Sequence, residues 1–85
     1  MRSGLRHMPY VSDESASREI ARRLEADNPL WIVVFGVYSK EFVCFPRFTV
    51  PGGAIVVAQY PGEVQPRMRR IEHAAPEAVA ALREG

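Results

Sequence analysis

The chain has 85 residues, a formal net charge of +1 and one cysteine. This length allows a single domain, the balanced charge argues against a large binding surface for nucleic acid or anionic membrane, and one cysteine excludes an internal disulfide. With no apolar run of about 20 residues to span a membrane and no signal-peptide pattern at the N-terminus, we expect a cytoplasmic protein with no membrane partner.

Residues 1–11 carry neither helical nor strand periodicity. Because such terminal segments are loose by default, we predict a flexible N-terminal tail over residues 1–11 and a single α+β domain over residues 12–85. A short chain buries a small fraction of its surface, and oligomerisation is a common source of added stability when no disulfide is present. The length of the chain therefore favours self-association.

A first helix is predicted from about Glu14 to Ala26. Ser12 and Asp13 supply side chains suited to an N-cap. The helix should end before Pro29, because proline disfavours the helical conformation in the residue before it. Apolar residues at i, i+4 and i+8 mark its buried side: Ala16, Ile20 and Leu24. This stripe is narrow, so the helix can cover only part of a sheet face.

Three runs rich in β-branched and aromatic residues follow, over residues 30–38, 42–48 and 54–60. Such residues suit a pleated, half-buried surface, and turn signals separate the runs. They predict a three-stranded antiparallel meander. Pro46 has no N–H for a ladder hydrogen bond, so we expect regular pairing of the second strand to stop near it.

Both faces of this sheet are predicted to be apolar. If the first hairpin places Val37 opposite Phe42, the period of two sorts the side chains onto two faces. An antiparallel sheet with one wet face alternates apolar and polar residues, and these strands do not. Since the chain has too few helices to cover both faces, we predict that one of them is an interface. The predicted interface residues are Trp31, Val33, Phe35, Val37, Phe42 and Phe48.

A second helical segment is predicted after Pro61. Pro66 falls in its first turn, where a missing N–H does little harm. Pro76 then breaks or kinks the helix and leaves a last short helix from Glu77 to Glu84. Apolar residues on one face of the longer piece should pack on the sheet: Val64, Met68, Ile71 and Ala75. The fold class is therefore α+β with the order α-β-β-β-α, and the helices pack on one face of the meander.

The sequence contains no recognisable catalytic, metal-binding or nucleotide-binding motif. Cys44 lies between apolar strand residues, where a buried cysteine behaves as a small hydrophobe, so a dyad with His73 is the weaker interpretation. One cysteine and two histidines do not supply the ligands of a metal site at the required spacing. We expect no enzymatic activity and no cofactor.

The densest basic cluster is Arg67, Arg69 and Arg70, on the second predicted helix. The α-β-β-β-α order resembles that of the double-stranded-RNA-binding domain, in which the second helix begins with a basic run. The resemblance implies that these three arginines would stand in for that run, although Pro66 and Met68 interrupt it. Nucleic-acid binding is thus the alternative function, and a solvated helix face is the simpler interpretation of the cluster.

Four short segments spread over the chain carry a second likeness. They are Pro29-Leu30-Trp31, Gly36-Val37-Tyr38-Ser39, Phe45-Pro46-Arg47-Phe48, and the helix that runs from Pro61-Gly62-Glu63 to Met68-Arg69-Arg70-Ile71-Glu72. Together they resemble small actinobacterial proteins with no assigned activity. The resemblance implies a bacterial, cytoplasmic accessory protein.

The leading hypothesis is a non-enzymatic protein-interaction module that self-associates through the predicted interface. Its partner would be a second copy of the chain, forming a homodimer, or another protein. A small-molecule pocket beneath Trp31, Tyr38 and Tyr60 is a third interpretation, ranked last because aromatic residues in so short a chain usually belong to the core.

Overall fold

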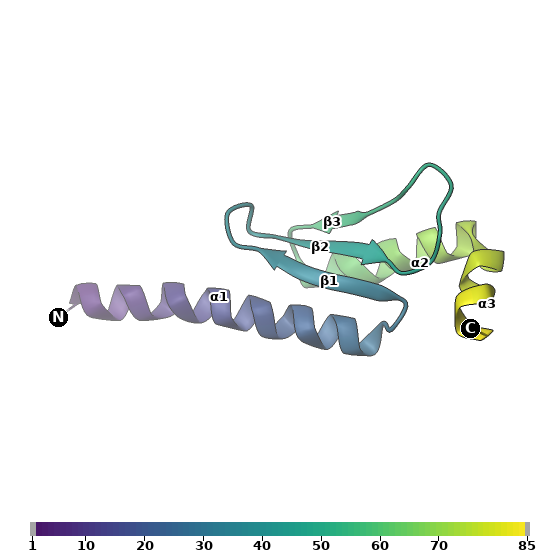
Figure 1. Cartoon of the computed structure of the whole chain (residues 1–85). Helices are drawn as coiled ribbons and strands as arrows, with labels where there is room; N and C mark the ends of the chain where they lie inside the picture. Colours follow the sequence, from purple (N-terminus) through teal and green to yellow (C-terminus); the bar gives the residue numbers. More distant parts are fainter. Residues whose placement is uncertain (1, 85) are drawn as a thin grey trace.

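The computed structural model describes the backbone of residues 2–84 and the side chains of residues 14–84. A helix is followed by three antiparallel strands in the order β1-β2-β3 and then by two helices, which confirms the predicted α+β fold (Figure 1). The elements are α1 (Arg2–Asp27), β1 (Trp31–Gly36), β2 (Glu41–Pro46), β3 (Val56–Ala58), the single 3-10 turn η1 (Pro61–Glu63), α2 (Val64–Ala74) and α3 (Pro76–Glu84).

The first helix is longer than the sequence indicated. α1 begins at Arg2, so the predicted start near Glu14 is wrong. The N-terminal part of α1 extends past the sheet (Figure 1), where a helix needs no apolar stripe, and apolar periodicity therefore did not reveal it. Ser12 and Asp13 lie inside α1, so the predicted N-cap at these residues is wrong. The predicted flexible tail over residues 1–11 stays a prediction.

The register of the first hairpin differs from the prediction by two residues. Phe42 pairs with Phe35 instead of Val37, and the turn closes with the Lys40 N–H donating to the Gly36 carbonyl at 2.8 Å. A shift of two leaves every side chain on its predicted face, because successive side chains in a strand alternate. β2 ends at Pro46 as predicted, since proline cannot continue the ladder.

The core lies between one face of the sheet and the helices. α1 runs along β1, and α2 lies behind the sheet (Figure 1). The sheet contributes Trp31, whose ring packs edge-on against Phe48 with centroids 5.5 Å apart. Val64 and Met68 of α2 are fully buried, as their spacing predicted. Both major helices therefore cover the same face.

The predicted interface residues lie on this covered face. Trp31 and Phe42 are 0% and 2% exposed, and Val33 and Phe48 are buried as well. Phe35 and Val37 are each half-buried. The assignment of the interface to this face is therefore wrong. Alternation along a strand separates two faces, but the path of the chain out of β3 and into β1 decides which of them receives the helices.

Candidate functional site

The opposite face of the sheet has no helix over it and is apolar across all three strands. Its members, which we call the open face, are Ile32, Val34, Val43, Phe45, Ile55 and Val57. Five of them are 38% to 54% exposed, and Val43 at the centre is half-buried. Isolated exposed apolar residues are ordinary, but a contiguous apolar patch indicates an interaction surface.

The strand register makes the open face continuous. Val43 of the central strand pairs with Val34 on one side and with Val57 on the other. Ile32 pairs with Phe45 in the next row of the same face. All six members are β-branched or aromatic, so the face is a smooth surface without a charged side chain at its centre.

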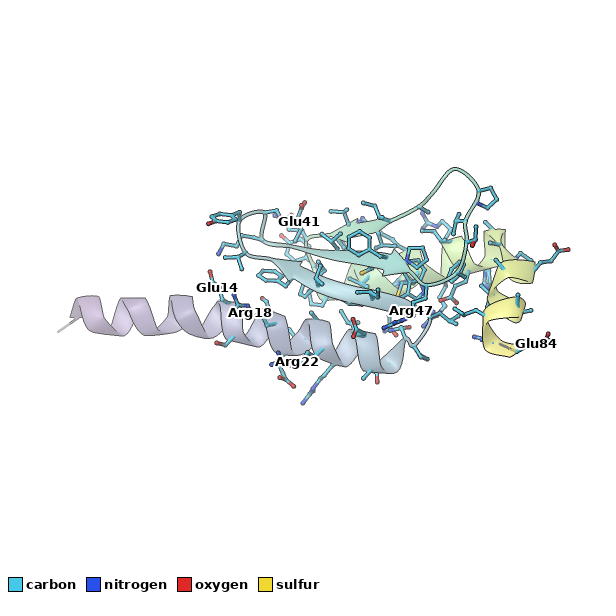
Figure 2. The ribbon with its side chains drawn as sticks, in the orientation of Figure 1. Glu14, Arg18, Arg22, Glu41, Arg47 and Glu84 are labelled. Atoms are coloured by element: carbon cyan, nitrogen blue, oxygen red, sulfur yellow. The ribbon has the colours of Figure 1, made fainter. Side chains whose placement is uncertain are left out.

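Charged residues stand at the two ends of the central strand. Glu41 begins β2 at the hairpin, and Arg47 follows β2 at its other end (Figure 2). An apolar centre with a polar rim is the usual composition of a protein interface.

At the edge of the sheet formed by β1, a side chain of α1 binds one backbone amide. The Val33 N–H donates a 2.8 Å hydrogen bond to Glu25 Oε1 of the helix, so this amide is not available to pair with another strand. The second oxygen of Glu25 lies 4.0 Å from the Arg47 guanidinium. Unpaired amides at a sheet edge invite pairing with another chain, and a charged side chain that binds them prevents it.

The edge formed by β3 carries a matching contact from α2. Arg67 donates a hydrogen bond from Nη1 to the Val57 carbonyl, and its Nη2 lies 3.7 Å from Glu63. β3 is only three residues long, so it offers a short template even where its backbone is free. An arginine and a glutamate from the two helices thus each hold a backbone group of an edge strand.

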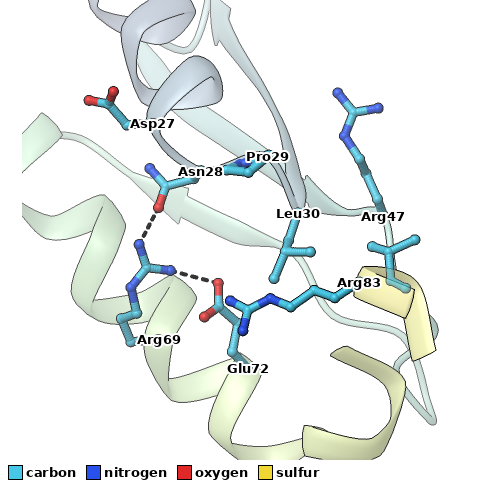
Figure 3. Close-up of a pocket in the computed structure, with 9 residues that line it drawn as sticks. Asp27, Asn28, Pro29, Leu30, Arg47, Arg69, Glu72 and Arg83 are labelled. Carbon is cyan, nitrogen blue, oxygen red and sulfur yellow. Dashed lines mark hydrogen bonds and ion pairs between the residues drawn. The ribbon is translucent and has the colours of Figure 1, made fainter. Parts of the chain in front are cut away.

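A cavity of about 610 Å³ lies where the end of α1 approaches α2 and α3 (Figure 3). Asn28, which is 2% exposed, donates from Nδ2 to the Leu24 carbonyl at 2.8 Å and to Gln65 Oε1 at 3.2 Å. Its Oδ1 accepts a hydrogen bond from Arg69 Nη2. This side chain joins the C-terminal end of α1 to α2.

The same network continues to Glu72. Arg69 Nη1 lies 2.6 Å from Glu72 Oε2, and that oxygen also accepts the Trp31 indole N–H at 2.7 Å. The polar groups of Asn28, Arg69 and Glu72 are therefore bound to one another, which is the arrangement of a structural junction. Arg83 of α3 extends into the cavity beside Leu30 (Figure 3).

The three arginines of the alternative function have different surroundings in the structure. Arg67 is held at the β3 edge, Arg69 is bound to Asn28 and Glu72, and Arg70 is exposed on α2. Arg22 of α1 points away from the sheet (Figure 2) and pairs with Glu19 at 2.8 Å, which lowers the pKa of that carboxyl. Two of the three predicted nucleic-acid contacts are thus engaged in the fold.

The aromatic residues of the third interpretation are likewise separate. Trp31 is buried in the core, whereas Tyr38 in the hairpin turn is 101% exposed and Tyr60 after β3 is 62% exposed. They do not line one pocket.

Cys44 is fully buried, and burial raises the pKa of its thiol to about 11. His73 is exposed on α2. Among residues 14–84, no three His, Cys, Asp or Glu side chains gather closely enough to hold a metal ion. In the part of the chain that the structure describes, no helix combines the length and the apolar character needed to cross a bilayer.

No protein-family model, curated protein or solved structure matched this chain. The likeness to small actinobacterial proteins and the topological likeness to the double-stranded-RNA-binding domain therefore stay predictions.

The sequence did not indicate the polar residues that matter most in the structure. No sequence pattern assigned a contact to Asn28, Glu25 or Glu72. The partners that join them to other elements (Val33 for Glu25, Trp31 for Glu72 and Arg69 for Asn28) lie 8 to 41 residues away along the chain, so no local pattern marks these contacts. The open face could be found from alternation, because it is the second apolar face of the predicted sheet.

Proposed function

We propose that the chain is a non-enzymatic protein-interaction module that self-associates, in the bacterial cytoplasm, through the open face of its sheet. The observation that carries this proposal is a contiguous apolar surface on all three strands, left uncovered by the helices. The only cysteine is buried as a thiol, which is consistent with a reducing compartment.

The other described surfaces support the absence of catalysis. In the cavity near α2, Arg69 is bound to Glu72 and Asn28. The buried Cys44 thiol is a poor nucleophile because only its thiolate reacts readily. A binding role therefore uses the open face, the apolar surface that the helices do not cover.

The test is the mass of the protein in solution when a charge is placed on the open face. Phe45→Asp introduces a carboxylate at a position that is 41% exposed, so the core should be unaffected. Tyr38→Asp removes an exposed aromatic residue in the hairpin turn and is the matched control. Both variants and the wild type are measured by sedimentation velocity over a wide range of concentrations.

We expect the mass of the wild type and of Tyr38→Asp to rise from one copy to two as concentration increases. Phe45→Asp should stay at one copy while its circular dichroism matches that of the wild type. A wild type that remains at one copy throughout, or a Phe45→Asp variant that still dimerises, contradicts the proposal.

A further inference from the structure

The inference concerns the cavity between the end of α1, α2 and α3, and it does not depend on self-association. Its volume of about 610 Å³ lies within the range of small-molecule sites, which is about 300–1,000 Å³. Residues 2–13, whose side chains are not described, lie at the opposite end of the molecule from α3 (Figure 1). The walls of the cavity are therefore side chains that the structure describes.

One wall of the cavity carries polar groups that are already bound. Arg69 Nη1 lies 2.6 Å from Glu72 Oε2, and Arg69 Nη2 donates a hydrogen bond to Asn28 Oδ1. Glu72 Oε2 also accepts the Trp31 indole N–H. Because the charges of Arg69 and Glu72 offset each other, this wall presents little net charge to a ligand.

Arg83 brings a positive charge that the fold does not neutralise. Its guanidinium extends from the last turn of α3 into the cavity (Figure 3), and it makes no hydrogen bond or ion pair with residues 14–84. Arg47 also lines the cavity, and its ion pair with Glu25 is long, at 4.0 Å. The Asp27 carboxylate points away from Arg83 (Figure 3). The cavity therefore favours an anion.

Apolar side chains complete the cavity. Leu30 is 8% exposed, Leu82 of α3 is 36% exposed, and Pro29 lies beside Leu30 in the chain. Small-molecule sites commonly combine apolar walls with a few polar groups that fix the orientation of the ligand. This combination distinguishes Arg83 from an arginine that is simply solvated at the C-terminal end of a helix.

We propose that the cavity binds a small organic carboxylate, with its carboxylate group on the Arg83 guanidinium and its apolar part against Leu30 and Leu82. A planar guanidinium matches a carboxylate, because two parallel N–H···O hydrogen bonds can form between them. A ligand with one negative charge suits the site better than a phosphate with two. The three arginines and two carboxylates that line the cavity leave a net charge of +1, and Glu72 repels any further negative charge.

NMR titration tests this site with octanoate and with octanamide, its neutral counterpart of the same chain length. The backbone amide signals of Leu30 and Leu82 report on the cavity, and that of Val57 reports on the open face, where an alkyl chain can also bind. Both compounds are titrated to millimolar concentrations into the wild type, Arg83→Gln and Arg70→Gln. Arg70 is exposed on α2 and does not line the cavity, so Arg70→Gln is the matched control for the loss of one charge.

We expect octanoate to shift the signals of Leu30 and Leu82 and to bind the wild type and Arg70→Gln with the same dissociation constant. Octanoate should bind Arg83→Gln about tenfold more weakly, and octanamide should bind the wild type about tenfold more weakly than octanoate does, because each change removes the ion pair and its hydrogen bonds.

Equal binding of octanoate and octanamide to the wild type overturns the proposal, and this comparison needs no variant to fold. An unchanged dissociation constant for octanoate in Arg83→Gln overturns it as well. Octanoate that shifts only the signal of Val57 binds at the open face, and octanoate that shifts no signal at millimolar concentration has no site. Either result also refutes the carboxylate site, while self-association is unaffected.

Discussion

The indole N–H of Trp31 donates a 2.7 Å hydrogen bond to Glu72 Oε2, and the same oxygen lies 2.6 Å from Arg69 Nη1. Trp31 is the largest fully buried side chain, and its only polar atom is satisfied by a carboxylate that an arginine neutralises. The contact joins the first strand to α2 across 41 positions of sequence. It therefore belongs to the set of contacts that hold α2 on the sheet.

Removing the Glu72 carboxylate should destabilise the fold, by an amount that depends on the residue that replaces it. Glu72→Ala leaves the Trp31 indole N–H and the Arg69 guanidinium without this partner and should lower the free energy of unfolding by about 2–3 kcal/mol. Glu72→Gln should cost about 1 kcal/mol, because its amide oxygen still accepts from the indole. Urea unfolding followed by Trp31 fluorescence measures both values. Glu77→Gln on the exposed first turn of α3 is the control, and equal losses in the two Glu72 variants would refute the role of the indole bond.

The buried amide of Asn28 should be required as an amide. Asn28→Asp replaces the Nδ2 donor with an oxygen that faces two acceptors, the Leu24 carbonyl and Gln65 Oε1. We expect a loss of about 1–3 kcal/mol in the free energy of unfolding, even though Arg69 lies beside the new carboxylate. Chemical denaturation at neutral pH checks this value. An Asn28→Asp variant as stable as the wild type would mean that the junction tolerates a different set of hydrogen bonds.

The buried thiol of Cys44 should make stability depend on pH in the alkaline range. Burial raises its pKa to about 11 from an ordinary value of 9.0, so the unfolded chain releases the proton first as pH rises. The contribution of Cys44 is fully present below pH 9 and is lost as pH rises toward 11, by at most about 1.4 kcal/mol per pH unit. Unfolding curves of the wild type and of Cys44→Ala over this range isolate the effect. Parallel pH profiles for the two proteins would contradict it.

The sequence predicted the two faces of the sheet correctly, but it did not predict the register of the first hairpin. The predicted pairing of Val37 with Phe42 was two positions from the observed pairing of Phe35 with Phe42, yet every strand residue kept its face. A period of two makes the division into faces independent of an even shift. The turn of the hairpin, in contrast, depends on a few local residues, and here Lys40 adopts a φ of 60° that its residue type did not indicate.

For the helices too, some features followed from local sequence patterns and others did not. Val64 and Met68 were predicted to be buried from their spacing, and Pro76 marked the break between α2 and α3, because periodicity and the missing proline N–H act locally. The start of α1 at Arg2 was missed, since the N-terminal part of the helix extends past the sheet, where a helix needs no apolar stripe.

The sequence by itself determined the α+β class, the three-stranded antiparallel meander, the two apolar faces of the sheet and the apolar side of α2. Only the tertiary structure decided which face the helices cover, and it placed Trp31 and Phe42 in the core while exposing Val34 and Phe45. The physical reason is that alternation is a property of each strand, whereas cover depends on the direction in which the chain crosses the sheet. The same crossing brought Glu25 and Arg67 to the two edges, where charges from distant segments meet backbone groups that no local pattern connects.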